Sequence, residues 1–131
     1  MAKYLIDTDI ASYAIKGFEK VAGNFVGHDK DELYISSITY AELMFGAVRK
    51  KSGRLKSLVA AFAKRLRMVD FDEVCSELYA GIRTDLEKAG TALDHMDILI
   101  AASAMSIGAV LITHNTKHFS KIKGLKVEDW S

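Results

Sequence analysis

Short apolar runs alternate with amphipathic segments along most of the chain. Apolar runs predict buried strands at residues 4–6, 33–35, 68–71 and 109–113, with a last short strand at 126–128. Between them, apolar residues recur at helical spacing and predict helices over 8–14, 18–26, 39–50, 55–66, 72–90 and 91–107, with a helical turn at 115–119. Strands separated by helices indicate an α/β fold with a short parallel central sheet flanked on both faces by helices.

Residue types that commonly begin or end helices indicate where the predicted helices start and stop. Thr39 followed three residues later by Glu42 has the pattern of a capping box, so a helix is expected to begin at Thr39. Thr91 is the expected cap of the last long helix. Gly90 and Gly108 are expected just past the ends of the two long helices in the second half of the chain.

Length and composition favour a single domain spanning residues 1–131. The chain of 131 residues contains no proline, and no repeat or low-complexity linker divides it. Cys75 is the single cysteine and cannot form an internal disulfide, which fits a reducing cytoplasm. No apolar run is long enough to cross a membrane, and the first residues lack the apolar core of a signal peptide. We therefore expect a cytoplasmic protein without a membrane partner.

The charge of the chain is nearly balanced, with a formal net charge of +1. Any nucleic-acid binding must therefore come from local basic patches. One cluster follows the predicted helix 39–50 and contains Arg49, Lys50, Lys51, Arg54 and Lys56. A second, near the end of the chain, contains Lys117, Lys121, Lys123 and Lys126. Each cluster could bind phosphates, or form an ordinary solvated face.

Three acids are candidates for a binding site, which a parallel α/β sheet places at the carboxyl ends of strands, where Asp7 and residues 113–115 lie. Asp7 ends the first strand, and its alternative role is to cap the following helix. Glu42 lies in the first turn of a helix, where it could serve only the capping box. Asp97 precedes the apolar stretch 98–102, where a carboxylate is costly unless it is paired or bound to a cation.

Further polar residues accompany these acids. Asp94 lies three residues before Asp97 and so on the same helical face, although it could simply favour the helix N-terminus. Asn115 follows the clearest strand and could cap the next turn or offer its carbonyl oxygen to a metal-bound water. His114 and His118 lie near the same end and are expected to be solvated or to face a ligand.

This set of groups suits metal-assisted hydrolysis of a phosphodiester. Carboxylates held close together raise one another's pKa values, and a hard divalent cation relieves the repulsion. Mg²⁺ and Mn²⁺ prefer oxygen ligands, activate a bound water and stabilise charge on phosphoryl oxygens. No competing cysteine or serine nucleophile motif is evident.

Four segments resemble the motifs of PIN-domain ribonucleases, and in particular bacterial VapC toxins. Residues 4–10 resemble the opening of PIN domains, and residues 38–47 resemble their second motif. Residues 97–102 resemble the third motif, and residues 111–119 with 124–130 are similar to the end of VapC toxins. The four segments occur in the family's order and span nearly the whole chain.

The resemblance implies a set of site residues. Asp7, Glu42 and Asp97 would be the catalytic and metal-binding acids. Asp94 and Asn115 would contribute through water, with Asn115 standing where many members have a fourth acid. The resemblance also implies that Thr8 and Thr113 line the pocket, and that RNA is contacted by Arg49, Lys50, Lys51 and Lys117.

The same resemblance implies an activity and partners. VapC toxins are Mg²⁺- or Mn²⁺-dependent endoribonucleases that cleave RNA, in several branches tRNA, and arrest growth when unrestrained. It further implies a homodimer that forms a higher assembly with a VapB antitoxin, which blocks the acidic pocket.

Three other interpretations remain open. The sequence Asp7-Thr8-Asp9 also resembles the start of haloacid-dehalogenase phosphatases, although Ala11 stands where that family has Thr or Val. A receiver-type signalling module would also place an Asp at a strand end, but neither alternative explains an acid before the apolar stretch 98–102. A catalytically inactive PIN domain that only binds RNA or protein is the third.

Overall fold

A five-stranded sheet with only parallel neighbours forms the centre of the protein in the computed structural model, which describes residues 2–131. The strands are β1 (Lys3–Ile6), β2 (Glu32–Ser36), β3 (Arg67–Val69), β4 (Val110–Ile112) and β5 (Val127–Glu128). Their order across the sheet is β3-β2-β1-β4-β5. Strands β2 and β3 thus lie on one side of β1, and β4 and β5 lie on the other. The strand order changes direction between β1 and β4, and open parallel sheets bind their ligands at such a point.

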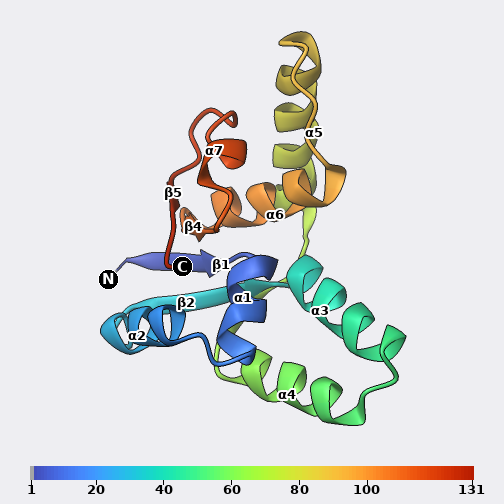
Figure 1. Ribbon diagram of the computed structural model, residues 1–131. Helices are drawn as coiled ribbons and strands as arrows, with labels where there is room; N and C mark the ends of the chain where they lie inside the picture. The colour runs from blue at the N-terminus through green and yellow to red at the C-terminus, as the bar shows by residue number, and fades with distance from the viewer. Residues whose placement is uncertain (1) are drawn as a thin grey trace.

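Helices cover both faces of the sheet, which confirms the predicted fold class (Figure 1). They are α1 (Thr8–Ile15), α2 (Glu19–Gly27), α3 (Ser37–Arg49), α4 (Gly53–Lys64), α5 (Glu73–Lys88), α6 (His95–Ser106) and α7 (Thr116–Phe119). Helices α1, α2 and α4 lie on one side of the sheet, and α5, α6 and α7 lie on the other (Figure 1). The hairpin of α3 and α4 and the long helix α5 extend away from the sheet.

The two halves of the core follow from the alternation of side chains along the strands. Leu5 and Leu111 belong to a cluster with residues of α5 and α6. Their neighbours Ile6 and Ile112 belong to the other cluster, with residues of α1, α2 and α4. All four side chains are fully buried, so β1 and β4 are anchored on both faces, and the loops that follow them are held in place.

The start of α3 differs from its prediction, and the capping-box interpretation of Thr39 and Glu42 is wrong. The helix begins at Ser37, with Ser36 as its cap, whose Oγ accepts a hydrogen bond of 3.0 Å from the Thr39 backbone N–H. Thr39 is therefore a buried residue of the first turn, and the Glu42 carboxylate is not needed at the helix start. The reason is that β2 runs directly into the helix, so its last residue becomes the cap.

Three other boundaries also differ. Helix α6 is capped by Asp94, whose Oδ1 accepts from the Met96 N–H at 2.8 Å, and Thr91 lies outside the helix. Helix α4 begins at Gly53, two residues before the predicted start at residue 55. The third strand ends at Val69, before the predicted end. Gly108 does follow α6, as predicted, in the left-handed conformation with φ of 65°.

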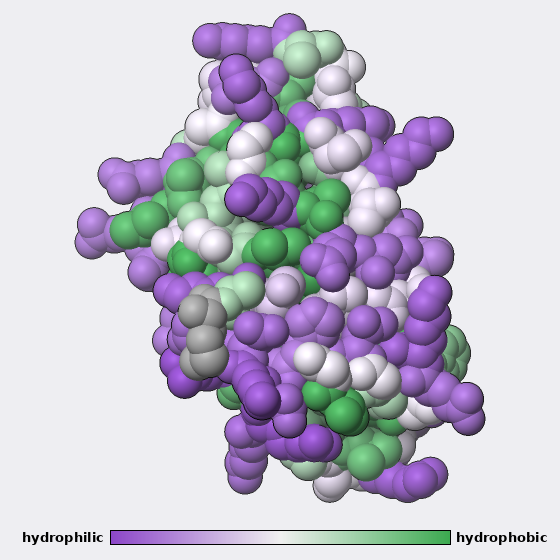
Figure 2. Space-filling model, turned by 90° about the vertical axis from the view of Figure 1, so that its left-hand side faces the viewer, coloured by the Kyte–Doolittle hydropathy of each residue, from purple (hydrophilic) through white to green (hydrophobic). Residues whose placement is uncertain are grey.

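The surface carries several exposed apolar side chains. On the face seen in Figure 2, hydrophilic residues form a belt between two more apolar areas. The most exposed large apolar residues include Val26 on α2 and Phe45 and Val48 on α3. Among residues 2–131, no helix is both long and apolar enough to span a membrane.

The cap of α3 gives a test of how the helix is held at the end of β2. Ser36→Ala leaves the Thr39 N–H without its buried partner, so the free energy of unfolding should fall by about 2 kcal/mol. The matched change Ser52→Ala removes the equivalent cap of α4, which is only partly buried, and should cost about 1 kcal/mol or less. Urea denaturation measures both. Equal losses, or no loss for Ser36→Ala, would contradict the assignment.

Candidate active site

The predicted acids come together at the carboxyl end of the sheet, beside the switch between β1 and β4. Asp7 follows β1 directly and caps α1, while Thr113 follows β4 directly. Glu42 comes from the second turn of α3, and Asp97 from the first turn of α6. Four different elements thus contribute to one place, as crossover connections of a parallel sheet allow.

Asp7 is the most buried acid of this site, with 5% of the residue exposed. Its Oδ1 accepts a hydrogen bond from the Thr8 N–H at 2.8 Å, and its Oδ2 accepts from Thr113 Oγ1 at 2.8 Å. Burial and the negative charges of Asp9 and Asp97 raise the pKa of Asp7 to about 7, although the two hydrogen bonds oppose the increase. The site therefore holds more negative charge than its surroundings neutralise.

Thr8 connects Asp7 to Glu42. Its hydroxyl lies 2.7 Å from Glu42 Oε1 and 3.1 Å from Thr39 Oγ1. Because one hydroxyl has a single proton, Thr8 donates to the carboxylate and accepts from the buried Thr39 hydroxyl. The predicted pocket residue Thr8 thus fixes the position of Glu42.

Asp97 has a partner that the sequence did not reveal. His118 Nε2 lies 3.0 Å from Asp97 Oδ2, joining α7 to the start of α6. Partial burial raises the pKa of Asp97, and the hydrogen bond from His118 works in the opposite direction. The nearby charge of Asp94 raises it further, which places Asp94 beside the site although it also caps α6.

Asp9 is a second residue that was not predicted. It lies in the first turn of α1, and its Oδ2 accepts a hydrogen bond of 3.1 Å from the His114 backbone N–H. Burial raises the pKa of Asp9 as well. The only signal in the sequence was its place two residues after Asp7, which by itself also fits a helix cap.

The remaining predicted residues divide into two groups. Asn115 is exposed beside the acids, with its backbone N–H donating to Thr113 Oγ1 at 3.1 Å. Lys117, from α7, lies one residue before His118, whose ring contacts Asp97. By contrast, the cluster Arg49, Lys50 and Lys51 lies at the far end of α3, about 10 Å beyond Glu42 along the helix axis. The structure does not bring that cluster to the site.

The oxygen ligands of this site suit a hard divalent cation, although the side chains alone do not surround an ion. Within residues 2–131, no three Asp, Glu, His or Cys side chains stand close enough to enclose an ion by themselves. Mg²⁺ keeps several waters and is usually bound through only one or two carboxylates. A buried carboxyl with a raised pKa, flanked by two further aspartates, supplies the oxygen donors and the negative charge that such an ion requires.

Comparison with known proteins decides the family. A family model described as "PIN domain" matches residues 4–125. The chain belongs to the PIN-domain family. This membership removes the phosphatase and receiver interpretations of the Asp7-Thr8-Asp9 motif.

Two curated relatives match this PIN domain over nearly its full length. "Ribonuclease VapC2" of Rickettsia felis is 35% identical, and the match covers 97% of each chain. "tRNA(fMet)-specific endonuclease VapC" of Shigella flexneri is 30% identical over 100% of both chains. Both are VapC proteins, so the predicted branch of the PIN-domain family is confirmed.

Solved structures agree with this grouping. The PIN domain superposes on a chain of VapBC2 from Rickettsia felis, bound to a promoter DNA fragment, with a TM-score of 0.93, 36% identity and coverage of 98% and 99%. A chain of DNA-bound VapBC from Salmonella typhimurium gives a TM-score of 0.91 and 34% identity, with complete coverage of both chains. Both structures are toxin–antitoxin complexes.

The raised pKa of Asp7 predicts how stability depends on pH in the absence of divalent ions. The folded protein binds this proton more tightly than the unfolded chain, so the contribution of Asp7 is fully present below pH 3.8 and is lost as the pH rises toward about 7. Asp7→Asn removes the charge. The free energy of unfolding of Asp7→Asn, relative to that of the wild-type protein, should therefore increase by about 2 to 3 kcal/mol between pH 5 and pH 8.

Urea denaturation in EDTA at both pH values measures this difference. Asp85→Asn, an exposed change on α5, serves as the control and should show no such growth. If the free energies of unfolding of Asp7→Asn and the wild-type protein differed by the same amount at pH 5 and pH 8, the Asp7 pKa would not be raised.

Proposed function

We propose that this PIN domain is a divalent-metal-dependent endoribonuclease of the VapC type, a toxin neutralised by a VapB antitoxin. The observation that carries the proposal is the convergence of Asp7, Asp9 and Asp97 at the switch point of the sheet, where Asp7 has a pKa of about 7. Such a concentration of carboxyl groups around a buried acid lowers stability, so a structural role does not account for it. Hydrolysis of a phosphodiester through a bound metal ion would account for it.

Each residue has a role in the proposed reaction. Asp7, Glu42 and Asp97 would hold Mg²⁺ or Mn²⁺, with Asp94 and Asn115 acting through bound water. When bound, the ion would supply an activated water and stabilise charge on the phosphoryl oxygens.

Neighbouring residues hold these ligands in place. Thr113 holds one oxygen of Asp7 through its hydroxyl, and Thr8 holds one oxygen of Glu42. Held in this way, the acids keep their spacing without a ligand present, and less reorganisation is needed when substrate binds.

The substrate class is RNA, and within it we propose tRNA. Relatives from Shigella flexneri and Salmonella typhimurium, 30% and 32% identical, are named tRNA(fMet)-specific endonucleases. Full-length matches at this identity support the same class of substrate for this chain. The particular tRNA depends on contacts outside the acids, because the acids recognise only the phosphodiester that all RNA shares.

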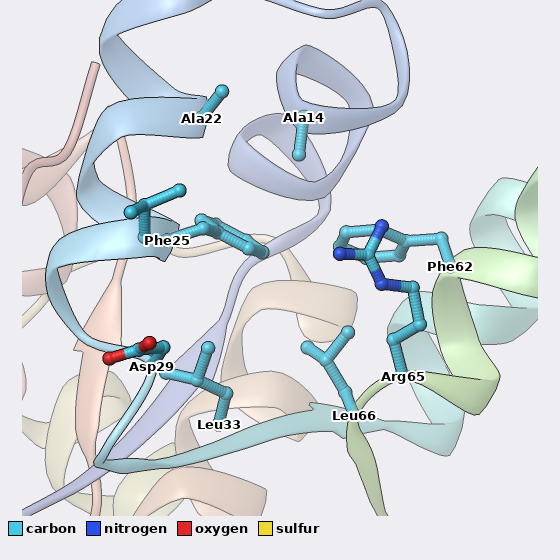
Figure 3. Close-up of a pocket in the computed structure, with 9 residues that line it drawn as sticks. Ala14, Ala22, Phe25, Asp29, Leu33, Phe62, Arg65 and Leu66 are labelled. Atoms are coloured by element: carbon cyan, nitrogen blue, oxygen red, sulfur yellow. The ribbon is translucent and has the colours of Figure 1, made fainter.

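A partner site is suggested by a cavity on the α1, α2 and α4 side of the sheet. It has a volume of about 420 Å³ and is mainly lined by apolar side chains, which point toward one another in Figure 3. Phe25 enters it from α2 and Phe62 from α4, with Arg65 and Asp29 at its edge. We propose that an apolar segment of the antitoxin fills this cavity, because the similar solved chains come from toxin–antitoxin complexes. A homodimer remains a prediction of the family resemblance.

The nuclease proposal is tested with conservative changes of the acids. Asp97→Asn and Asp7→Asn should each reduce Mg²⁺-dependent cleavage of purified tRNA by more than about 100-fold, because each removes a metal-binding charge. Asp85→Asn should cleave as the wild-type protein does. Circular dichroism verifies folding, and EDTA should stop the wild-type reaction. Undiminished cleavage by either site variant would disprove the assignment, and an inert wild-type protein would favour an inactive PIN domain.

The antitoxin proposal is tested by a charge placed in the apolar cavity. Ala22 is exposed on α2 and lines the cavity, so Ala22→Arg should weaken binding of the cognate antitoxin at least about 10-fold through the cost of burying an unpaired charge. Ala80→Arg on the exposed face of α5 is the matched control. Calorimetric titration gives both affinities. Equal affinities for the two variants would place the antitoxin elsewhere.

A further inference from the structure

A groove beside the acids is built almost entirely from one short stretch of chain. Its volume is about 370 Å³, and its lining residues are His114, Asn115, Thr116, Lys117, His118 and Lys121. These residues form the connection after β4, helix α7 and the turn that follows it. In Figure 1, this stretch lies above the carboxyl end of the sheet, next to α6.

The same stretch is hydrogen-bonded to three aspartates of the site, Asp7, Asp9 and Asp97. Thr113 Oγ1 donates to Asp7 at 2.8 Å, and the His114 N–H donates to Asp9 at 3.1 Å. His118 Nε2 lies 3.0 Å from Asp97 Oδ2. The groove is therefore fixed to the acids by three separate hydrogen bonds, and its position relative to the acids is set before any ligand binds.

The charge of the groove is opposite to that of the acids. Lys117 and Lys121 are exposed at its lining, and no Asp or Glu lines it. Neither lysine takes part in the ion pairs found for the described part of the chain, residues 2–131. Two ammonium groups are thus available to an external anion, directly beside a site that would cleave a phosphodiester.

The chemistry of the hydrogen-bond donors also fits phosphate oxygens. His118 uses Nε2 on Asp97, so its other ring nitrogen remains for a ligand, and the Asn115 amide is exposed in the same groove. Lysine ammonium groups contact phosphates without regard to base sequence. These groups can hold a backbone phosphate, and they do not read a base.

We propose that this groove binds the RNA backbone on one side of the cleaved bond, with Lys117 and Lys121 contacting the phosphates that flank the acids. The inference rests on the proposed ribonuclease function and deepens it by naming where the substrate enters. RNA is the favoured occupant because the stretch that forms the groove is hydrogen-bonded to Asp7, Asp9 and Asp97, so a chain lying in the groove lies beside the acids. Binding in the groove also offsets the repulsion between the RNA and the carboxylates.

The test measures the salt dependence of RNA binding without cleavage. Fluorescence anisotropy of end-labelled tRNA in EDTA, over a series of NaCl concentrations, gives the slope of log affinity against log salt. The variant Lys117→Gln with Lys121→Gln should lose at least about 10-fold in affinity and lower the magnitude of the slope by about 1 to 2, because each lost phosphate contact contributes about 0.7 to 0.9.

The matched control is Lys64→Gln with Lys88→Gln, at exposed positions at the ends of α4 and α5. It lowers the net charge by the same amount, so its slope should change by less than about 0.5 if the effect depends on position. In Mg²⁺, the groove variant should raise KM for tRNA cleavage and leave kcat within about threefold, because it loses binding in the ground state and the transition state alike.

The outcomes separate this inference from the function on which it rests. If the wild-type protein binds tRNA through the groove but never cleaves it, the nuclease proposal fails and the binding site stands. Equal slopes for the groove and control variants would overturn the inference, as would a wild-type protein that does not bind tRNA. A groove variant that lost affinity for the antitoxin and kept its affinity for RNA would overturn it in favour of a protein partner.

Discussion

The burial of one carboxyl group determines the chemistry of this end of the molecule. Asp7 sits between the fully buried residues Leu5 and Ile6 of β1 and the helix that it caps, so its position is fixed by the core on both faces of the sheet. Two hydrogen bonds hold its oxygens, yet burial and two neighbouring aspartates keep its pKa near 7. A fold that accepts this cost gains a concentration of oxygen donors at one point, and a hard cation bound there would relieve the repulsion.

Two chemically different surfaces lie on different sides of the same sheet. The acids and the groove lined by Lys117 and Lys121 both lie at the carboxyl end of β1 and β4. Negative and positive charges therefore lie side by side there. The apolar cavity lies between α1, α2 and α4, on the face opposite α5 and α6. A substrate and an apolar protein segment can therefore be recognised by different chemistry, one by charge and the other by burial of apolar area.

Features that depend on residues close together in the sequence could be predicted, and contacts between residues far apart in the sequence could not. The strands and the places of Asp7 and Asp97 followed from local hydrophobic patterns, because an acid next to a buried run has few explanations. The partner of Asp97 is 21 residues away in the chain, and only packing of α7 against α6 reveals that it is His118. The cap of α3 was misassigned because Ser36 ends a strand, and its role depends on where β2 stops.

The most direct test of the account is the pKa of Asp7, followed by carbon NMR of the labelled carboxyl group during a pH titration. Without divalent ions, the account predicts a midpoint near 7. With saturating Mg²⁺, the carboxylate form is favoured, and the midpoint should fall by at least about 2 units. A midpoint near 4 in EDTA, or a midpoint near 7 that Mg²⁺ leaves unchanged, would contradict the claim that this buried acid forms a metal site.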